Sequence, residues 1–132
     1  DINYTGGMTE AMRAAHLGLN EVANCNTCCP PTKALMTGTA FGASALNLNQ
    51  CGQIISGKQA DFVLIDANNW RYKNSRHWLR THLLAGSSND IHSIYIAGKA
   101  VVDNYQSTRF NENELWQDYL TAAESARARI RP

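Results

Sequence analysis

The feature that most constrains the fold is a stretch of two short apolar runs around a glycine turn, CGQIISGKQADFVLID at residues 51–66. Gly57-Lys58 marks the turn, and the run FVLI in the second half is apolar at every position. Runs of this length between turn residues are typical of strands, and a strand without a polar side is expected to be covered on both faces. The stretch predicts a hairpin with strands at 53–56 and 61–66, and it carries no set of groups for chemistry on a substrate.

The first third of the chain predicts two helices. Apolar side chains recur every three or four residues over 8–22, which indicates one face of an amphipathic helix. Pro30 and Pro31 end that pattern, and Thr32 is the expected N-cap of a second helix over 33–46. The second helix is rich in glycine and alanine, so another backbone is expected to pack closely against it.

The second half of the chain predicts alternating helices and strands. Residues 67–76 indicate a polar loop, and the following short helix is expected to end at Gly86. A second hairpin is expected around a two-residue turn at Gly98-Lys99. The last helix begins with the capping-box pattern of Asn111 and Glu114 and continues with one apolar face.

Composition limits the classes of partner. The chain has 132 residues, of which 44% are hydrophobic, so it can bury a core of domain size. The net charge is +1 and the 12 lysines and arginines are scattered, which disfavours a nucleic-acid partner. No apolar run approaches the roughly 20 residues of a membrane span. The chain opens on Asp1 without a starting methionine or a signal peptide, so we expect a cytoplasmic protein and a piece of a longer one.

The four cysteines do not form a recognisable metal motif. Cys25, Cys28 and Cys29 crowd into CNTCC, and Cys51 stands alone. A structural zinc site uses four thiolate or imidazole ligands, usually as two spaced pairs, and only one pair is present. Three cysteines within five residues also disfavour a disulfide framework. Reduced thiols around a loop are therefore the expected state, which suits a cytoplasmic protein.

The four histidines do not form a catalytic set either. His16 lies beside an apolar helix face and is expected to be a packed side chain. His77 and His82 are five residues apart, which turns them to different sides of a helix, whereas ligand pairs use a spacing of three or four. His92 alternates with strand residues and is expected on a sheet surface. From spacing alone, the chain is a mixed α/β domain without a complete active site.

The order of the segments nevertheless resembles the C-terminal region of the metal-dependent amidohydrolase superfamily, in its cytosine deaminase and chlorohydrolase branch. The resemblance rests first on a small-residue helix followed by a Gly-x-Ile-x-x-Gly-Lys-x-Ala-Asp strand motif, here residues 38–46 and 52–66. The later HLLAGSSNDIHSIYIAGKAVVDN is similar to the family's helix, strand and Gly-Lys-x-Val-Val ending. The upstream DINYTGGMTEAMRAAHLGL resembles the segment after the eighth barrel strand.

The resemblance implies a fold and a site. The fold would be the C-terminal part of a (β/α)8 barrel plus part of a small composite β-sandwich. Residues 1–48 would be the last barrel loop and helices, 49–109 the sandwich hairpins with an inserted short helix, and 110–132 a C-terminal helix. Asp1 would stand at the end of strand eight as metal ligand and catalytic carboxylate, with Asn3 and Tyr4 in a substrate-binding loop.

The resemblance also implies an activity for the intact parent, namely hydrolysis of a non-peptide C–N bond of a small-molecule substrate, of deaminase type. A divalent metal, Zn or Fe, would serve the parent, whereas this isolated chain is expected to bind none and to be inactive. The open strand edges and apolar surface of a partial fold predict a homo-oligomer. Two alternatives remain open: a freestanding scaffold or oligomerisation module without catalysis, and a small metal-binding protein built on the cysteine cluster.

Overall fold

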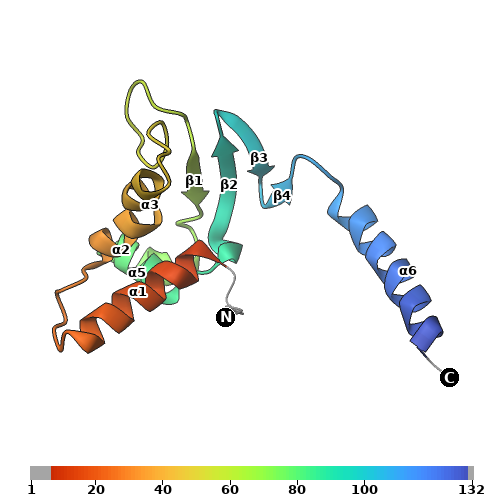
Figure 1. Cartoon of the computed structure of the whole chain (residues 1–132), viewed down its shortest axis with the longest axis horizontal. Coiled ribbons are helices and arrows are strands. Elements are labelled where there is room, and N and C mark those ends of the chain that lie inside the picture. Colours follow the sequence, from red (N-terminus) through yellow and green to blue (C-terminus); the bar gives the residue numbers. More distant parts are fainter. Residues whose placement is uncertain (1–6, 131–132) are drawn as a thin grey trace.

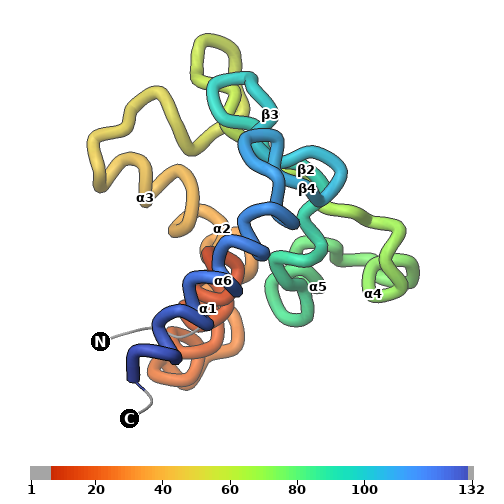
Figure 2. Tube along the Cα trace, turned by 90° about the vertical axis from the view of Figure 1, so that its right-hand side faces the viewer, coloured from red at the N-terminus to blue at the C-terminus, as the bar shows by residue number. Residues whose placement is uncertain are grey.

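The computed structural model describes residues 7–130 of the chain. It combines helices with one antiparallel sheet of four strands in the order β1-β2-β3-β4. Figure 1 shows helices from the first part of the chain gathered near one end of the sheet and the last helix standing apart from the rest of the chain. In Figure 2, the short helices α3 (Ala40–Ala45) and α4 (Trp70–Lys73) lie on opposite sides of the strands. The mixed α/β class is therefore confirmed.

The helical body is built from α1, α2 and α5. Helix α1 spans Met8–Val22, as the periodicity predicts, and buries Thr9, Met12 and His16. Helices α2 (Pro31–Gly38) and α5 (Trp78–Ala85) pack against it. The buried apolar cluster where they meet consists of Met12, Cys29, Ala34 and Leu83. A Cβ on Gly38 would lie 2.7 Å from the sulfur of Met12, so any larger residue at this position would push the Met12 side chain aside.

The expected helix over 33–46 is two helices, because the backbone breaks at Thr39. Its φ of −128° and ψ of −97° fall outside the helical region, and α3 (Ala40–Ala45) starts a new axis. The expected N-cap at Thr32 is also wrong. Pro30 occupies the cap and Pro31 the first helical position, where the missing N–H costs nothing and the ring holds a helical φ.

The central hairpin joins β2 (Ile91–Ile96) to β3 (Lys99–Asp103). Its turn lies one residue earlier than expected, at Ala97 and Gly98, which have φ values of 49° and 75°. Two successive positive φ angles give the turn whose twist matches that of the flanking strands. Strand β4 (Gln106–Ser107) extends the sheet beyond β3.

The expected hairpin at 51–66 does not form, because only its second half is a strand. Strand β1 (Phe62–Ile65) pairs with β2, and the rings of Phe62 and Tyr95 stack across them at 4.6 Å. Residues 53–56 are irregular, and Ile54 is 80% exposed. The edge of β1 that they would have paired stays open within the described chain. The expected cover over both faces of FVLI is likewise absent within residues 7–130, since Val63 to Ile65 are exposed.

Two further elements complete the chain. The expected loop at 67–76 contains one helical turn, α4 (Trp70–Lys73), which is capped by the side chain of Asn69. The one-turn 3-10 helix η1 (Ser88–Asp90) leads into β2. The last helix, α6, spans Glu112–Ile130, and Asn111 caps it by accepting from the backbone N–H groups of Asn113 and Glu114.

Helix α6 buries no side chain among the described residues. Its expected apolar face is present in sequence but uncovered, with Trp116 57% exposed and stacked only on the neighbouring Tyr119. No helix within residues 7–130 has both the length and the apolar character needed to cross a membrane.

Candidate functional site

The three site residues expected from the sequence, Asp1, Asn3 and Tyr4, lie outside the described residues. The segment that carries them leads directly into α1. The structure shows which contacts hold the start of α1. The same contacts hold the point where the candidate site segment joins the described residues.

Helix α1 is fixed to α5 by polar contacts from its first two turns. The side-chain oxygen of Thr9 lies 3.3 Å from Nε2 of His82. Arg13 donates from Nε to the carbonyl of Leu83 at 2.7 Å and from Nη2 to the carbonyl of Gly86. The last carbonyls of a helix have no partner within it, and a cation stabilises that negative end. Arg13 thus caps α5 and ties α1 to it.

Behind this contact lies a buried carboxylate. Asp90 is 2% exposed and accepts four kinds of donor. They are Arg71 Nη1 at 2.9 Å, the Tyr72 hydroxyl at 2.9 Å, the Ser87 N–H at 3.0 Å and the Asn69 amide at 3.1 Å. A buried carboxylate is stable only when its charge is paired and its lone pairs are filled, and both conditions hold here.

His82 connects the Asp90 cluster to the start of α1. Its Nδ1 lies 2.9 Å from the Tyr72 hydroxyl, whose proton goes to Asp90. Nδ1 must then carry the proton that His82 donates to the Tyr72 oxygen, which leaves Nε2 to accept from Thr9. This tautomer completes a chain of hydrogen bonds from Thr9 through His82 and Tyr72 to Asp90.

The electrostatics agree with a neutral His82 and a neutral Tyr72. Burial lowers the pKa of His82, although the negative charge of Asp90 opposes that shift. Burial, together with the hydrogen bond to Asp90, raises the pKa of Tyr72 to about 12. The four-residue chain therefore carries a single negative charge, on Asp90, at neutral pH. It holds protons in fixed positions and is suited to positioning rather than to proton transfer.

Sequence patterns do not predict this cluster as a whole, although they carry one signal for part of it. Ser87 and Asp90 form a capping box around η1, the Ser-x-x-Asp spacing that marks a helix start. The spacing predicts the contact between those two residues. It does not predict Arg71, Tyr72 and His82, which come from two other helices.

The other histidines are placed apart. His16 is buried on α1, as expected, and contacts the carbonyl of Cys29. His77 is exposed before α5, and His92 pairs with Ser93 and Tyr105 on the sheet. Within residues 7–130, no three His, Cys, Asp or Glu side chains are grouped so that they could hold a metal ion.

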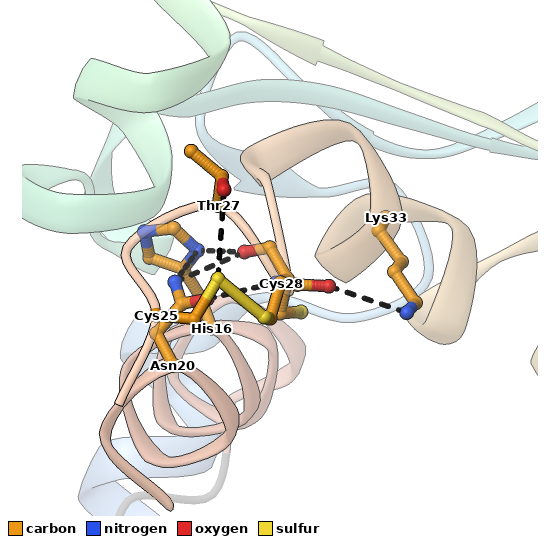
Figure 3. Close-up of a disulfide and its surroundings, with 7 residues drawn as sticks. His16, Asn20, Cys25, Thr27, Cys28 and Lys33 are labelled. Carbon is orange, nitrogen blue, oxygen red and sulfur yellow. Dashed lines mark hydrogen bonds between the residues drawn. A yellow bond between two sulfur atoms is a disulfide. The ribbon is translucent and has the colours of Figure 1, made fainter. Parts of the chain in front are cut away.

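The cysteine expectation is wrong in one respect. Cys25 and Cys28 form a disulfide, shown in Figure 3, with Cα atoms 5.6 Å apart. The loop between α1 and α2 folds back on itself, which brings the two residues within the range that a disulfide requires. Cys29 is a buried free thiol and Cys51 is a free thiol elsewhere in the chain. With one pair oxidised and two thiols apart, the alternative of a cysteine-cluster metal protein has no support in this structure.

Comparison with known proteins identifies the family. The model of the amidohydrolase family matches residues 2–101. A 5-methylthioadenosine/S-adenosylhomocysteine deaminase from Halalkalibacterium halodurans is 30% identical over 108 residues, which are 82% of this chain and 25% of that protein. The same enzyme from Bacillus cereus is 32% identical over 109 residues, with the same two coverages. The chain thus spans about a quarter of the length of these relatives.

Solved structures agree with the sequence match. A zinc-bound adenosine deaminase from Xanthomonas campestris superimposes with a TM-score of 0.79 at 25% identity, over 92% of this chain and 28% of that one. A zinc complex of atrazine chlorohydrolase from Arthrobacter aurescens has the same fold, with a TM-score of 0.71 at 15% identity over 86% and 25% of the two chains. The resemblance predicted from the motifs is confirmed, and this chain belongs to the amidohydrolase family.

Proposed function

We propose that this chain is the C-terminal portion of a metal-dependent amidohydrolase that releases ammonia from a small-molecule substrate. The observation that carries the proposal is the similarity to two deaminases over 82% of the chain. In such a reaction water adds to the carbon that bears the amino group, and the C–N bond breaks. Because the chain spans a quarter of those relatives, the activity is assigned to the intact parent and not to these 132 residues.

The proposal divides the chain by role. Residues 1–48 would complete a (β/α)8 barrel, 49–109 would contribute to the small β-sandwich, and 110–132 would form the C-terminal helix. The pairing of β1 with β2 and the open edge of β1 support a sheet that strands from elsewhere in the parent would extend. Active sites of such barrels lie at the C-terminal ends of the strands, which is where the segment before α1 would emerge.

Asp1 is the proposed catalytic carboxylate and metal ligand, and Asn3 and Tyr4 are the proposed substrate contacts. The described residues do not by themselves fit a metal, since no suitable group of three side chains occurs within 7–130. A divalent ion, Zn or Fe, would need ligands from the rest of the parent. What the described residues contribute is support: Thr9, Arg13 and His82 fix the helix that directly follows the proposed site segment.

Ammonia release tests the proposal. The intact parent should deaminate an adenosine- or guanine-type substrate, and the 132-residue chain alone should not. In the parent, Asp1→Asn should lower turnover by several orders of magnitude with little loss of stability, because the change removes the proposed carboxylate ligand and base while keeping the size of the side chain. Asp118→Asn on α6 is the matched control and should keep full turnover. Turnover by the isolated chain that a chelator abolishes would contradict the proposal, as would near-normal turnover of the Asp1 variant.

A second candidate, a self-associating module without catalysis, is favoured by one observation. Apolar side chains are exposed on the first half of α6 and on β1, including Leu115, Trp116 and Val63. Expression of the 132-residue chain as a natural, stable, oligomeric product without an upstream barrel would favour this candidate. A natural product about four times as long would favour the enzyme.

A further inference from the structure

The loop between α1 and α2 carries a feature that the proposed function does not use, and the inference drawn from it does not depend on that function. Cys25 and Cys28 form a disulfide on the surface of this loop, with Cys28 exposed and Cys25 partly so. Figure 3 shows the bond beside the end of α1, with Lys33 of α2 reaching the Cys28 carbonyl at 3.3 Å. An exposed disulfide is open to attack by a thiolate from solution.

The loop is held in place by contacts other than the disulfide. Asn20 on α1 accepts from the Cys29 N–H at 2.8 Å and donates to the Cys29 carbonyl at 3.2 Å. His16 contacts the same carbonyl from the core. On the other side, the N–H of Cys25 donates to the backbone carbonyl of Asn20 at 2.9 Å.

These contacts keep the two cysteines adjacent whether or not they are bonded. Cys25 is attached to the last turn of α1, and Cys28 directly precedes a residue whose N–H and carbonyl are both bound. Two thiols confined in this way have a high effective concentration toward each other, so the disulfide can open and close without refolding of the loop.

The two other cysteines are poor competitors. Cys29 is 1% exposed and its side chain belongs to the apolar cluster with Met12 and Leu83, so reagents cannot reach it in the folded chain. For Cys51, hydrogen bonding with the Asp61 carboxylate raises the pKa of the thiol, which lowers its thiolate fraction.

We propose that Cys25 and Cys28 are a reversible dithiol–disulfide pair that exchanges with a small-molecule thiol of the glutathione class. In reduction, a glutathione thiolate attacks the exposed sulfur of Cys28, the Cys25–Cys28 bond breaks, and Cys25 leaves as a thiolate that takes a proton. A second glutathione thiolate then attacks the sulfur of the first, which forms glutathione disulfide and releases Cys28. Two glutathione thiols are oxidised and one protein disulfide is reduced; oxidation is the reverse.

The test uses the 132-residue chain in oxygen-free buffers that contain glutathione and glutathione disulfide in varied ratios. After acid quenching and alkylation, mass spectrometry counts the labelled cysteines and peptide mapping places them. We expect one reversible two-electron transition in which Cys25 and Cys28 gain label together, with the same circular dichroism spectrum at both ends. Three results would overturn the proposal. They are labelling of Cys29 or Cys51 in place of this pair, a transition in which the chain unfolds, and the absence of a disulfide at every ratio.

Variants separate the pair from its surroundings. Cys28→Ser should remove the two-electron transition and leave only a glutathione adduct on Cys25, whereas Cys51→Ser should leave the transition unchanged. Asn20→Ala loosens the loop and should shift the equilibrium toward the dithiol about tenfold, which corresponds to about 1.4 kcal/mol. Asn26→Ala, an exposed change in the same loop, is its control and should not shift it. Equal midpoints for the two asparagine variants would contradict the argument from loop order.

Discussion

Replacing Asp90 by asparagine should destabilise the protein by about 3 kcal/mol. Oδ1 of Asp90 accepts from Asn69 and Arg71, and Oδ2 accepts from Arg71, Tyr72 and Ser87. An asparagine has the same size but presents an NH2 group to one of these two sets. At least two hydrogen bonds are therefore lost whichever way the amide turns, and Arg71 loses its charged partner in both orientations.

The magnitude follows from those losses. A hydrogen bond to a charged group contributes about 1.5–3 kcal/mol, and breaking a buried ion pair costs about 3–5 kcal/mol. The Arg71 side chain is 27% exposed, so water regains part of the guanidinium and the lower end of the range applies. Tyr72 also has a second place for its proton, because it can turn toward His82.

Urea unfolding followed by circular dichroism measures the free energy of unfolding. Asp118→Asn on the exposed α6 makes the same chemical change at a solvated site and should alter stability by no more than about 0.5 kcal/mol. A double-mutant cycle with Tyr72→Phe isolates the Asp90–Tyr72 contact and should give a coupling of about 1 kcal/mol. An Asp90→Asn loss below about 1 kcal/mol would refute the claim that this carboxylate organises the junction of α1, α4 and α5.

Three further predictions follow from the structure. Reduction of the Cys25–Cys28 disulfide should lower the free energy of unfolding by about 2 kcal/mol, which is the chain-entropy value for so small a loop. A loss above about 4 kcal/mol in urea unfolding would contradict the claim that contacts other than the disulfide hold this loop. The free energy of unfolding should fall as the pH drops below about 6.5, because the fold keeps His82 neutral while the unfolded chain takes up a proton there. His82→Gln should weaken this dependence on pH, and His77→Gln should leave it unchanged. The isolated chain should self-associate at micromolar concentration through its exposed apolar residues, with Trp116→Glu reducing the mass seen by light scattering; a monomer with one cooperative melt would show that the fragment closes a core of its own.

Elements set by local pattern were predictable from the sequence. Helix α1 has the expected bounds because its periodicity and the proline break agree, and α6 begins where the Asn111 cap places it. The β2–β3 hairpin was expected within one residue of its turn. In each case the residues that fix the element are neighbours in the chain.

Elements that depend on distant partners were not predictable in the same way. Residues 53–56 have the composition of a strand, but a strand needs another strand for its backbone groups, and none pairs with this segment in the described chain. The helix breaks at Thr39, and a threonine, unlike a proline or a glycine, does not predict a break at its own position. The hydrogen bonds that run from Thr9 through His82 and Tyr72 to Asp90 join residues 81 positions apart in the sequence. These residues meet only because α1 packs on α5.

The isolation of α6 has a consequence for how the chain responds to heat and to hydrogen exchange. In the monomer, a helix that shares no core with the rest of the chain gains no cooperativity from it, so the helicity of α6 follows the helix–coil equilibrium of a 19-residue peptide. The amides of α6 exchange through local fraying, which costs little free energy. Those of β2, which is paired on both sides, exchange only when the chain unfolds globally. The protein therefore has two thermal responses in one chain, a gradual one in the last 19 helical residues and a cooperative one in the body.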